Sequence, residues 1–129
     1  MHMGGDVCGN GVARHLGHEA FREYAARELS VAPPWARGVC FNPGCSAPFE
    51  PRRSWQVYCS AGCEALGKAE MRRWGHRMAL PLLVHRLGKY EQRDGDIIEV
   101  TRAARRYVTQ AQSLWLADRA RRRQEVPHG

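Results

Sequence analysis

The sequence predicts a mainly α-helical fold that also contains one small β-hairpin. Two observations support this: apolar residues recur at helical spacing over several stretches, and residues 39–59 combine Pro and Gly with short β-compatible pieces. With 129 residues, the chain is long enough to bury one core. We expect one compact domain, in which 1–37 form a tail and an amphipathic helix, 38–80 a cysteine-bearing module with its helix, and 81–129 the C-terminal helices.

The first predicted helix runs from His18 to Leu29, "HEAFREYAAREL", with apolar residues on one face and Glu and Arg on the other. Pro33 and Pro34 follow it and cannot continue a helix. Three possible metal ligands lie in or beside this segment: Cys8, His15 and His18. They are candidates for a second metal site, or else an unpaired thiol and two ordinary histidines.

The second predicted helix begins near the last cysteine pair. Ser60 can cap its start, and apolar residues at helical intervals carry it to about Ala79. Leu80 precedes Pro81, which favours a break there. We therefore expect "PLLVHRLG" to form a separate short helix, with proline inside its start and glycine past its end.

The third predicted helix has the longest pattern of 3.6-residue spacing, with an apolar stripe from Ile97 to Trp115. This stripe on the C-terminal helix is also a candidate contact for a homodimer. The end of the chain, "RARRRQEVPHG", lacks apolar spacing and is expected to fray.

Four cysteines form the most specific pattern in the sequence: C-x4-C, thirteen residues, then C-x3-C. They are Cys40, Cys45, Cys59 and Cys63. This is the ligand spacing of one tetrahedral Zn²⁺ held by four thiolates. Cys63 is expected in the first turn of a helix, whose positive end favours a thiolate. The alternative is a pair of disulfides or free buried thiols.

The stretch "CFNPGCSAPFEPRRSWQVYCSAGC", above all its "YCSAGC", resembles treble-clef zinc fingers, in particular FCS-type fingers and small bacterial and phage-borne proteins that end such a finger in a basic helix. It is also similar to the zinc finger of CGNR-type bacterial transcriptional regulators, which share the C-x4-C opening. The resemblance covers about residues 38–78. Two features depart from it: "CEAL" replaces Cys-Gly-Asn-Arg, and the first spacing is wider than the two residues usual in FCS fingers. The resemblance implies a treble-clef-like zinc module flanked by helices, the four ligands, and nucleic-acid binding as a family tendency.

The chain is basic, with 20 Lys and Arg against 13 Asp and Glu and a net charge of +7. This balance favours a polyanion or an acidic protein surface as partner. Nucleic-acid contacts are predicted at Arg52 and Arg53 in the hairpin turn, and at Lys68, Arg72, Arg73 and Arg77 on the helix that follows Cys63. The i,i+4 spacing places the helical residues in adjacent stripes that can lie against phosphates. The nucleic acid is expected to be DNA more than RNA. The alternative is a solvated basic surface.

Further arginines line the terminal helix: Arg102, Arg105, Arg106, Arg119, Arg121, Arg122 and Arg123. They extend the positive charge toward the C-terminus and add to the predicted contacts with a polyanion. Three aromatic residues of the hairpin, Phe49, Trp55 and Tyr58, are predicted to form its core, the alternative being a platform for base stacking.

We expect a small zinc-binding protein that binds nucleic acid, a regulator from a bacterium or a mobile element. It is not expected to be an enzyme, because four thiolates leave no open coordination position and no catalytic triad or phosphate loop is found in the sequence. The alternative is a phage-type inhibitor or adaptor that binds a protein partner, zinc being purely structural. Its support is the set Trp35, Trp74 and Trp115, more tryptophan than a small core needs. No apolar stretch approaches the roughly 20 residues of a membrane span, and a cytoplasmic protein is expected.

Overall fold

The computed structural model describes Phe21, Glu23, Tyr24 and residues 37–53 and 55–126. The helix predicted from His18 to Leu29 lies mostly outside these residues, as do Cys8, His15 and Trp35. Among the described residues, no helix has the length and apolar character that crossing a membrane requires.

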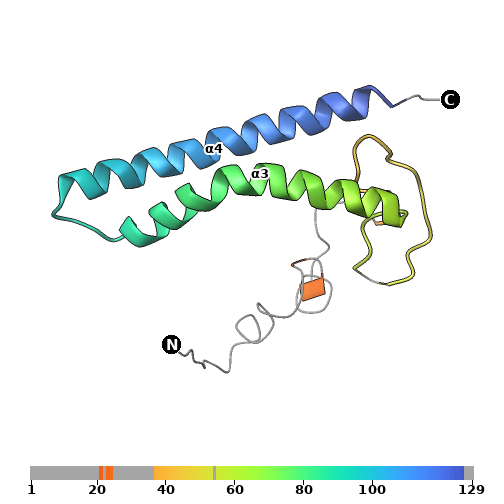
Figure 1. The fold of residues 1–129 in the computed structure, drawn as a ribbon, viewed down its shortest axis with the longest axis horizontal. Coiled ribbons are helices and arrows are strands. Elements are labelled where there is room, and N and C mark those ends of the chain that lie inside the picture. Colours follow the sequence, from red (N-terminus) through yellow and green to blue (C-terminus); the bar gives the residue numbers. More distant parts are fainter. Residues whose placement is uncertain (1–20, 22, 25–36, 54, 127–129) are drawn as a thin grey trace.

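Two long helices, α3 (Ala61–Gly88) and α4 (Gly95–Gln124), lie side by side and antiparallel (Figure 1). Each begins at a side-chain cap. The Ser60 hydroxyl accepts a hydrogen bond from the Cys63 N–H over 3.2 Å, and the Asp94 carboxylate accepts from the N–H groups of Asp96 and Ile97. These caps satisfy backbone donors that a helix start leaves without a partner.

The predicted break at Pro81 is wrong, because α3 continues through it to Gly88. Pro81 costs the helix one backbone hydrogen bond. The helix nevertheless continues, because residues on both sides of Pro81 pack against α4: Met78 lies in the shared core, and Gly88 lies against Thr101. Tertiary packing thus outweighs the local preference of proline.

The predicted fraying of the C-terminal end is also wrong for the residues that the structure describes there, since α4 extends to Gln124. Ion pairs replace the missing apolar contacts in this last stretch. Arg121 bonds Asp118 and Glu125, and Arg122 bonds Asp118 and Glu70. Pairs at i,i+3 and i,i+4 support a helix from its surface.

The core between the helices is built from Trp74 and Met78 of α3 and Val108 and Ala111 of α4, with Trp115 against it. The indole rings of Trp74 and Trp115 stack with centroids 5.8 Å apart and an interplanar angle of 4°. Burying each large apolar side chain stabilises the pair by about 1.5–3 kcal/mol. Toward the far end the helices approach closely, because Gly88 has no Cβ and leaves room for the Thr101 hydroxyl.

The predicted β-hairpin is not present, and this part of the fold prediction is wrong. In the described part of residues 37–60, the β-type pairing is an isolated antiparallel bridge between Val39 and Pro48, and no strand forms. Prolines explain the outcome, because Pro43, Pro48 and Pro51 have no N–H to donate to a ladder. The segment is instead a compact loop that lies beside the start of α3 and the end of α4 (Figure 1). The described core is mainly helical, as expected.

The loop has its own small cluster of buried residues. Cys40, Val57 and Tyr58 are buried, and Phe41 and Phe49 pack against them. The Phe41 N–H donates to the Val57 carbonyl over 2.7 Å and joins the two halves of the loop. With Asn42 and Pro43, five residues of the loop are buried. These are few for a segment of this length, so this part of the chain needs another source of stability.

Candidate metal centre

The four predicted ligands converge in the structure. The Sγ atoms of Cys40, Cys45, Cys59 and Cys63 all lie within 4.8 Å of one another. The Sγ atoms of Cys45 and Cys59 are 3.8 Å apart, as are those of Cys59 and Cys63. A tetrahedral ion with metal–sulfur bonds of about 2.3 Å places its sulfurs about 3.8 Å apart. The cluster therefore fits one metal ion.

The alternative of two disulfides is excluded for these four residues. All four are free thiols, and a disulfide needs its sulfurs at about 2.05 Å. Their convergence across more than twenty residues of chain, with no bond between them, is the arrangement expected of ligands that share an ion.

The tight turn "CFNPGC" brings the first two cysteines together. The Asn42 carbonyl accepts hydrogen bonds from the N–H groups of Cys45 and Ser46, each over 2.9 Å. The Asn42 side-chain oxygen accepts a third, from the Gly44 N–H over 3.0 Å. Ser46 leaves the turn with φ +54, in the left-handed region that short polar residues tolerate better than branched ones. Asn42 is thus the organising residue of the turn, and it is buried.

Two donors point at the sulfurs. The Asn42 side-chain amide donates to the Cys63 Sγ over 3.5 Å, and the Cys59 N–H donates to the Cys40 Sγ over 3.4 Å. Cys63 also stands in the first turn of α3, where the helix dipole favours negative charge. N–H groups directed at ligating sulfurs orient them and stabilise the thiolate form.

The ligands differ in acidity. The hydrogen bond from Asn42 lowers the pKa of Cys63 to about 7, against the opposing effect of burial. Burial raises the pKa of Cys40 to about 12. A metal ion that binds all four as thiolates must therefore displace protons, and most of all from Cys40.

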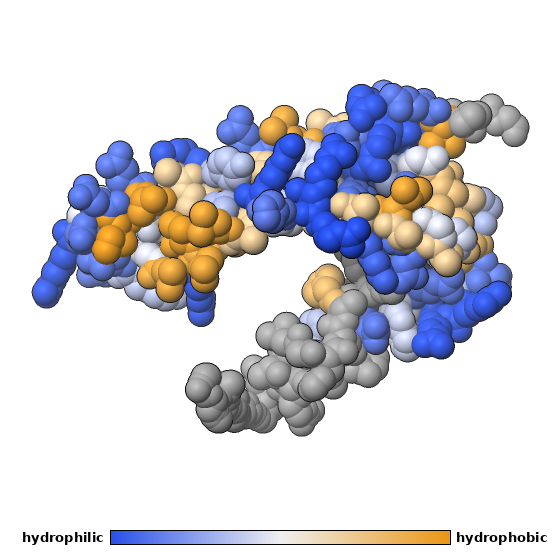
Figure 2. Space-filling view, in the orientation of Figure 1, coloured by the Kyte–Doolittle hydropathy of each residue, from blue (hydrophilic) through white to orange (hydrophobic). Residues whose placement is uncertain are grey.

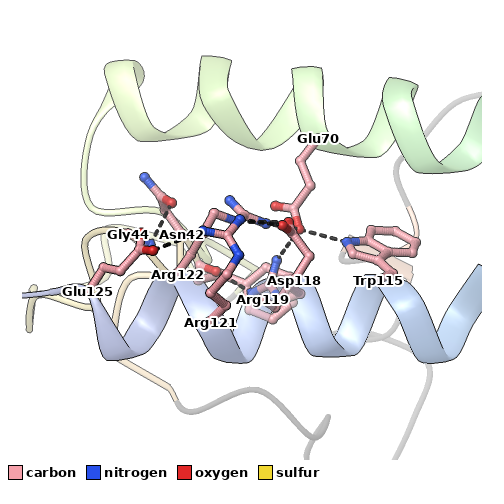
Figure 3. A network of polar contacts seen from close by, with 10 residues as sticks. Asn42, Gly44, Glu70, Trp115, Asp118, Arg119, Arg121, Arg122 and Glu125 are labelled. Atoms are coloured by element: carbon pink, nitrogen blue, oxygen red, sulfur yellow. Dashed lines mark hydrogen bonds and ion pairs between the residues drawn. The ribbon is translucent and has the colours of Figure 1, made fainter.

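Arg119 of α4 connects the cysteine loop to the helix pair (Figure 3). Its guanidinium lies over the Phe41 ring, with Cζ 4.0 Å from the centroid, and donates to the Phe41 carbonyl. The same guanidinium donates to the Glu70 Oε2 of α3 over 2.7 Å. Phe41 directly follows the ligand Cys40, so this contact fixes the loop on the helices next to the metal site.

Glu70 is buried and accepts three hydrogen bonds on one oxygen (Figure 3). The donors are Trp115 Nε1 at 2.7 Å, Arg119 at 2.7 Å and Arg122 at 2.9 Å. Burial by itself raises the pKa of Glu70, but the bonds from Trp115 and Arg119 and the charges of Arg119 and Arg122 outweigh it, so the pKa lies below its ordinary value of 4.5.

The sequence analysis missed the role of Glu70. The pattern that could have found it is its position, four residues before Trp74 and three after Gly67. An acidic residue at an apolar position of a helix, in a chain rich in arginine, indicates a buried ion pair.

The six predicted nucleic-acid contacts are all exposed. Four of them lie along α3, namely Lys68, Arg72, Arg73 and Arg77, while Arg52 and Arg53 lie in the loop before it. Exposed Lys68 pairs with Glu64 at 3.7 Å. Arg73 and Arg77 place their guanidinium carbons 5.7 and 4.8 Å from the centre of the Trp74 ring. All six cations are thus at the surface, and among the described residues Lys68 is the one of them with a carboxylate partner.

The arginines near the C-terminus are different, because three of them are engaged within the molecule. Arg119 and Arg122 bond Glu70, and Arg121 bonds Asp118 and Glu125. Their predicted contribution to polyanion binding is reduced accordingly. Tyr58 and Phe49 belong to the loop cluster, which favours the core interpretation of the loop aromatics. Trp74 and Trp115 stack on each other in the helical core.

Comparison with protein families, curated proteins and solved structures finds no match for this chain. The four-cysteine cluster agrees with the metal-binding part of the treble-clef resemblance. That the cysteine module is a treble clef remains a prediction. The identification of a metal site rests on the geometry described above.

Proposed function

We propose that this protein holds one structural Zn²⁺ at its four cysteines and binds the phosphate backbone of nucleic acid with the exposed basic residues of α3 and the preceding loop. The exposure of all six predicted residues is the observation that most supports nucleic-acid binding. The regulatory setting comes from the treble-clef resemblance and is carried over as part of the proposal.

The chemistry of the ligands supports zinc and a structural role. Thiolates are soft ligands, and a tetrahedral set of four is typical of structural zinc. Such a set fills the coordination shell and leaves no position for water or substrate. We therefore propose a non-catalytic protein, in which the ion adds to the small apolar cluster of residues 37–60.

The way charge is distributed supports nucleic-acid binding. Cations that only support the fold are paired with carboxylates, as Arg119 and Arg122 are with Glu70. On α3, by contrast, Arg73 and Arg77 lie near an aromatic ring, which positions a guanidinium without neutralising it. Such cations remain free to contact phosphate oxygens, which give affinity and orientation without reading bases.

The test is a salt titration of binding to a labelled 20-base-pair duplex, followed by fluorescence anisotropy. Binding through phosphates predicts that affinity falls linearly on a log–log plot, with a slope of about −0.9 per phosphate neutralised. The double variant Arg73→Ala, Arg77→Ala is expected to weaken binding and make the slope shallower by about 2.

Arg121→Ala is the matched control, because it removes an exposed arginine whose charge is already paired. It is expected to leave the slope nearly unchanged. Absence of binding at low salt, or equal effects of the α3 double variant and the control, would contradict the proposal. A 20-base-pair RNA duplex, run in parallel, decides between DNA and RNA, because it matches the DNA in length and strandedness.

A further inference from the structure

The two helices expose large apolar side chains at the end of the molecule farthest from the cysteines. On α3, Leu80, Leu83 and Leu87 are 68%, 55% and 78% exposed, and on α4, Val100 and Tyr107 are each 51% exposed. We call these five residues the distal face. Figure 2 shows apolar side chains gathered over this end of the helix pair.

The five residues fall on one side of the helix pair. The seam is the line along which α3 and α4 touch, and it includes Gly88, Thr101 and Val108. Leu87 directly precedes Gly88, Val100 precedes Thr101, and Tyr107 precedes Val108. One residue turns a helix by about 100°. Because α3 and α4 are antiparallel, the residue directly before a seam residue points to the same side of the pair on both helices.

Leu80 and Leu83 extend the stripe on α3 with spacings of three and four residues up to Leu87. Leu80 precedes Pro81 as Leu87 precedes Gly88, whereas Leu83 is turned about 200° from Pro81 and forms the edge of the stripe farthest from α4. Each helix therefore has two apolar stripes, one in the seam and one on the distal face. A helix with a single partner needs one such stripe. The second stripe indicates a second partner.

We infer that the distal face is the interface with a second copy of this chain, so that two helix pairs pack face to face as a four-helix bundle. A two-fold interface uses the same patch on both copies, so one contact covers both distal faces. The five side chains, with small Ala103 between Val100 and Tyr107, expose on the order of several hundred Å². This approaches the roughly 800 Å² per partner of a stable interface.

The charges beside the distal face suit a like partner. Glu99 and Arg106 are exposed on α4, and Arg77 is exposed on α3 one turn before Leu80. Among the described residues, the ion pairs involve neither Glu99 nor Arg106. In a two-fold dimer, an ion pair between an acidic residue of one copy and a basic residue of the other occurs twice, because symmetry repeats each contact. A patch with both signs at its margin favours self-association over a partner of one strong charge.

The experiment measures the mass of the full chain, with its cysteine site loaded with zinc, by sedimentation equilibrium over a range of concentrations. The wild type is expected to have twice the monomer mass of 14.6 kDa. Leu80→Glu is expected to be monomeric, because it places a charge on the part of the interface that lies next to Val100 and Tyr107. Leu80→Ala, which disturbs folding less, is expected to raise the dissociation constant of the dimer about tenfold.

Leu82→Glu is the matched control. Leu82 is 52% exposed on the same turn of α3. It follows Pro81, which lies three residues after the core residue Met78 and seven before Gly88, so Leu82 points to the opposite side of the pair from Leu80. It is expected to remain dimeric. A wild type that is monomeric at every concentration overturns the inference, whether residues 1–36 or another protein then covers the face. A dimer that survives Leu80→Glu, or dissociates equally with Leu82→Glu, overturns it as well. Circular dichroism and zinc content confirm that each variant is folded.

Discussion

Arg119 and Glu70 form an ion pair with 2.7 Å between Nη1 and Oε2, and both side chains are largely removed from solvent. Because Arg119 also contacts Phe41, one guanidinium links both helices and the cysteine loop. The loop that carries the metal site is therefore anchored on the helix pair. The proposed nucleic-acid contact draws on this link, since the link sets where the loop arginines lie relative to α3.

Arg119→Ala is expected to lower the free energy of unfolding by about 3 kcal/mol, because it leaves a buried carboxylate with fewer donors and removes a hydrogen bond to the Phe41 carbonyl. The measurement is denaturant unfolding of zinc-loaded protein. Arg121→Ala serves as control; its ion pairs are exposed, and a change below about 1 kcal/mol is expected. Similar losses of unfolding free energy in both variants would show that the Glu70–Arg119 pair contributes no more to stability than the ion pairs of Arg121.

Gly88→Ala and Gly75→Ala test the close approach of the helices. A Cβ at Gly88 would collide with the Thr101 hydroxyl, whereas a Cβ at Gly75 meets nothing within 4 Å. We expect Gly88→Ala to destabilise the protein by about 1–3 kcal/mol through overpacking. Gly75→Ala should stabilise it by up to about 1 kcal/mol through helix propensity. Thermal unfolding of both variants checks the opposite signs, and two stabilising substitutions would contradict the packing of Gly88 on Thr101.

The Glu70 network predicts a dependence of stability on pH. The pKa of Glu70 is below its ordinary value of 4.5, so its carboxylate stabilises the fold above that value, and the contribution is lost as the pH falls through the lowered pKa. The difference in unfolding free energy between wild type and Glu70→Gln should be full at pH 7 and shrink below about pH 4.5. Both proteins lose metal in acid, so comparing them removes that effect. A difference that stays constant down to pH 3 would contradict the network.

Much of the site and part of the fold follow from the sequence. The cysteine spacing predicted four converging sulfurs, because ligands close in sequence can meet with little chain entropy lost. The two long helices followed from apolar periodicity. The continuation through Pro81 did not, because it depends on contacts with α4 that no local pattern contains.

The β-hairpin failed for a related reason. Residues such as those in "WQVYC" have β propensity, but a ladder needs N–H donors that Pro43, Pro48 and Pro51 lack. Glu70 was missed because its three donors come from α4, more than forty residues away. Long-range partners of a single acidic residue are decided by the packing of helices, which residue spacing alone does not give.

Removal of the metal should affect the two parts of the molecule differently. The cluster that holds residues 37–60 consists of eight residues, four of which are the cysteine ligands, whereas the core between α3 and α4 contains no ligand. With a chelator, amide hydrogens of this loop, such as those of Cys45 and Phe41, should exchange at least about a hundredfold faster, while those around Ala104 and Val108 stay protected. Hydrogen exchange with mass spectrometry measures both. Loss of protection throughout, or in neither part, would contradict this division.

The central claim is that four thiolates share one zinc ion, and X-ray absorption at the zinc edge, combined with metal analysis of the purified protein, tests it most directly. The predicted result is one zinc per chain with four sulfur neighbours at about 2.3 Å. A shell containing nitrogen or oxygen ligands, or a metal-free protein with the four cysteines joined in disulfides, would contradict it.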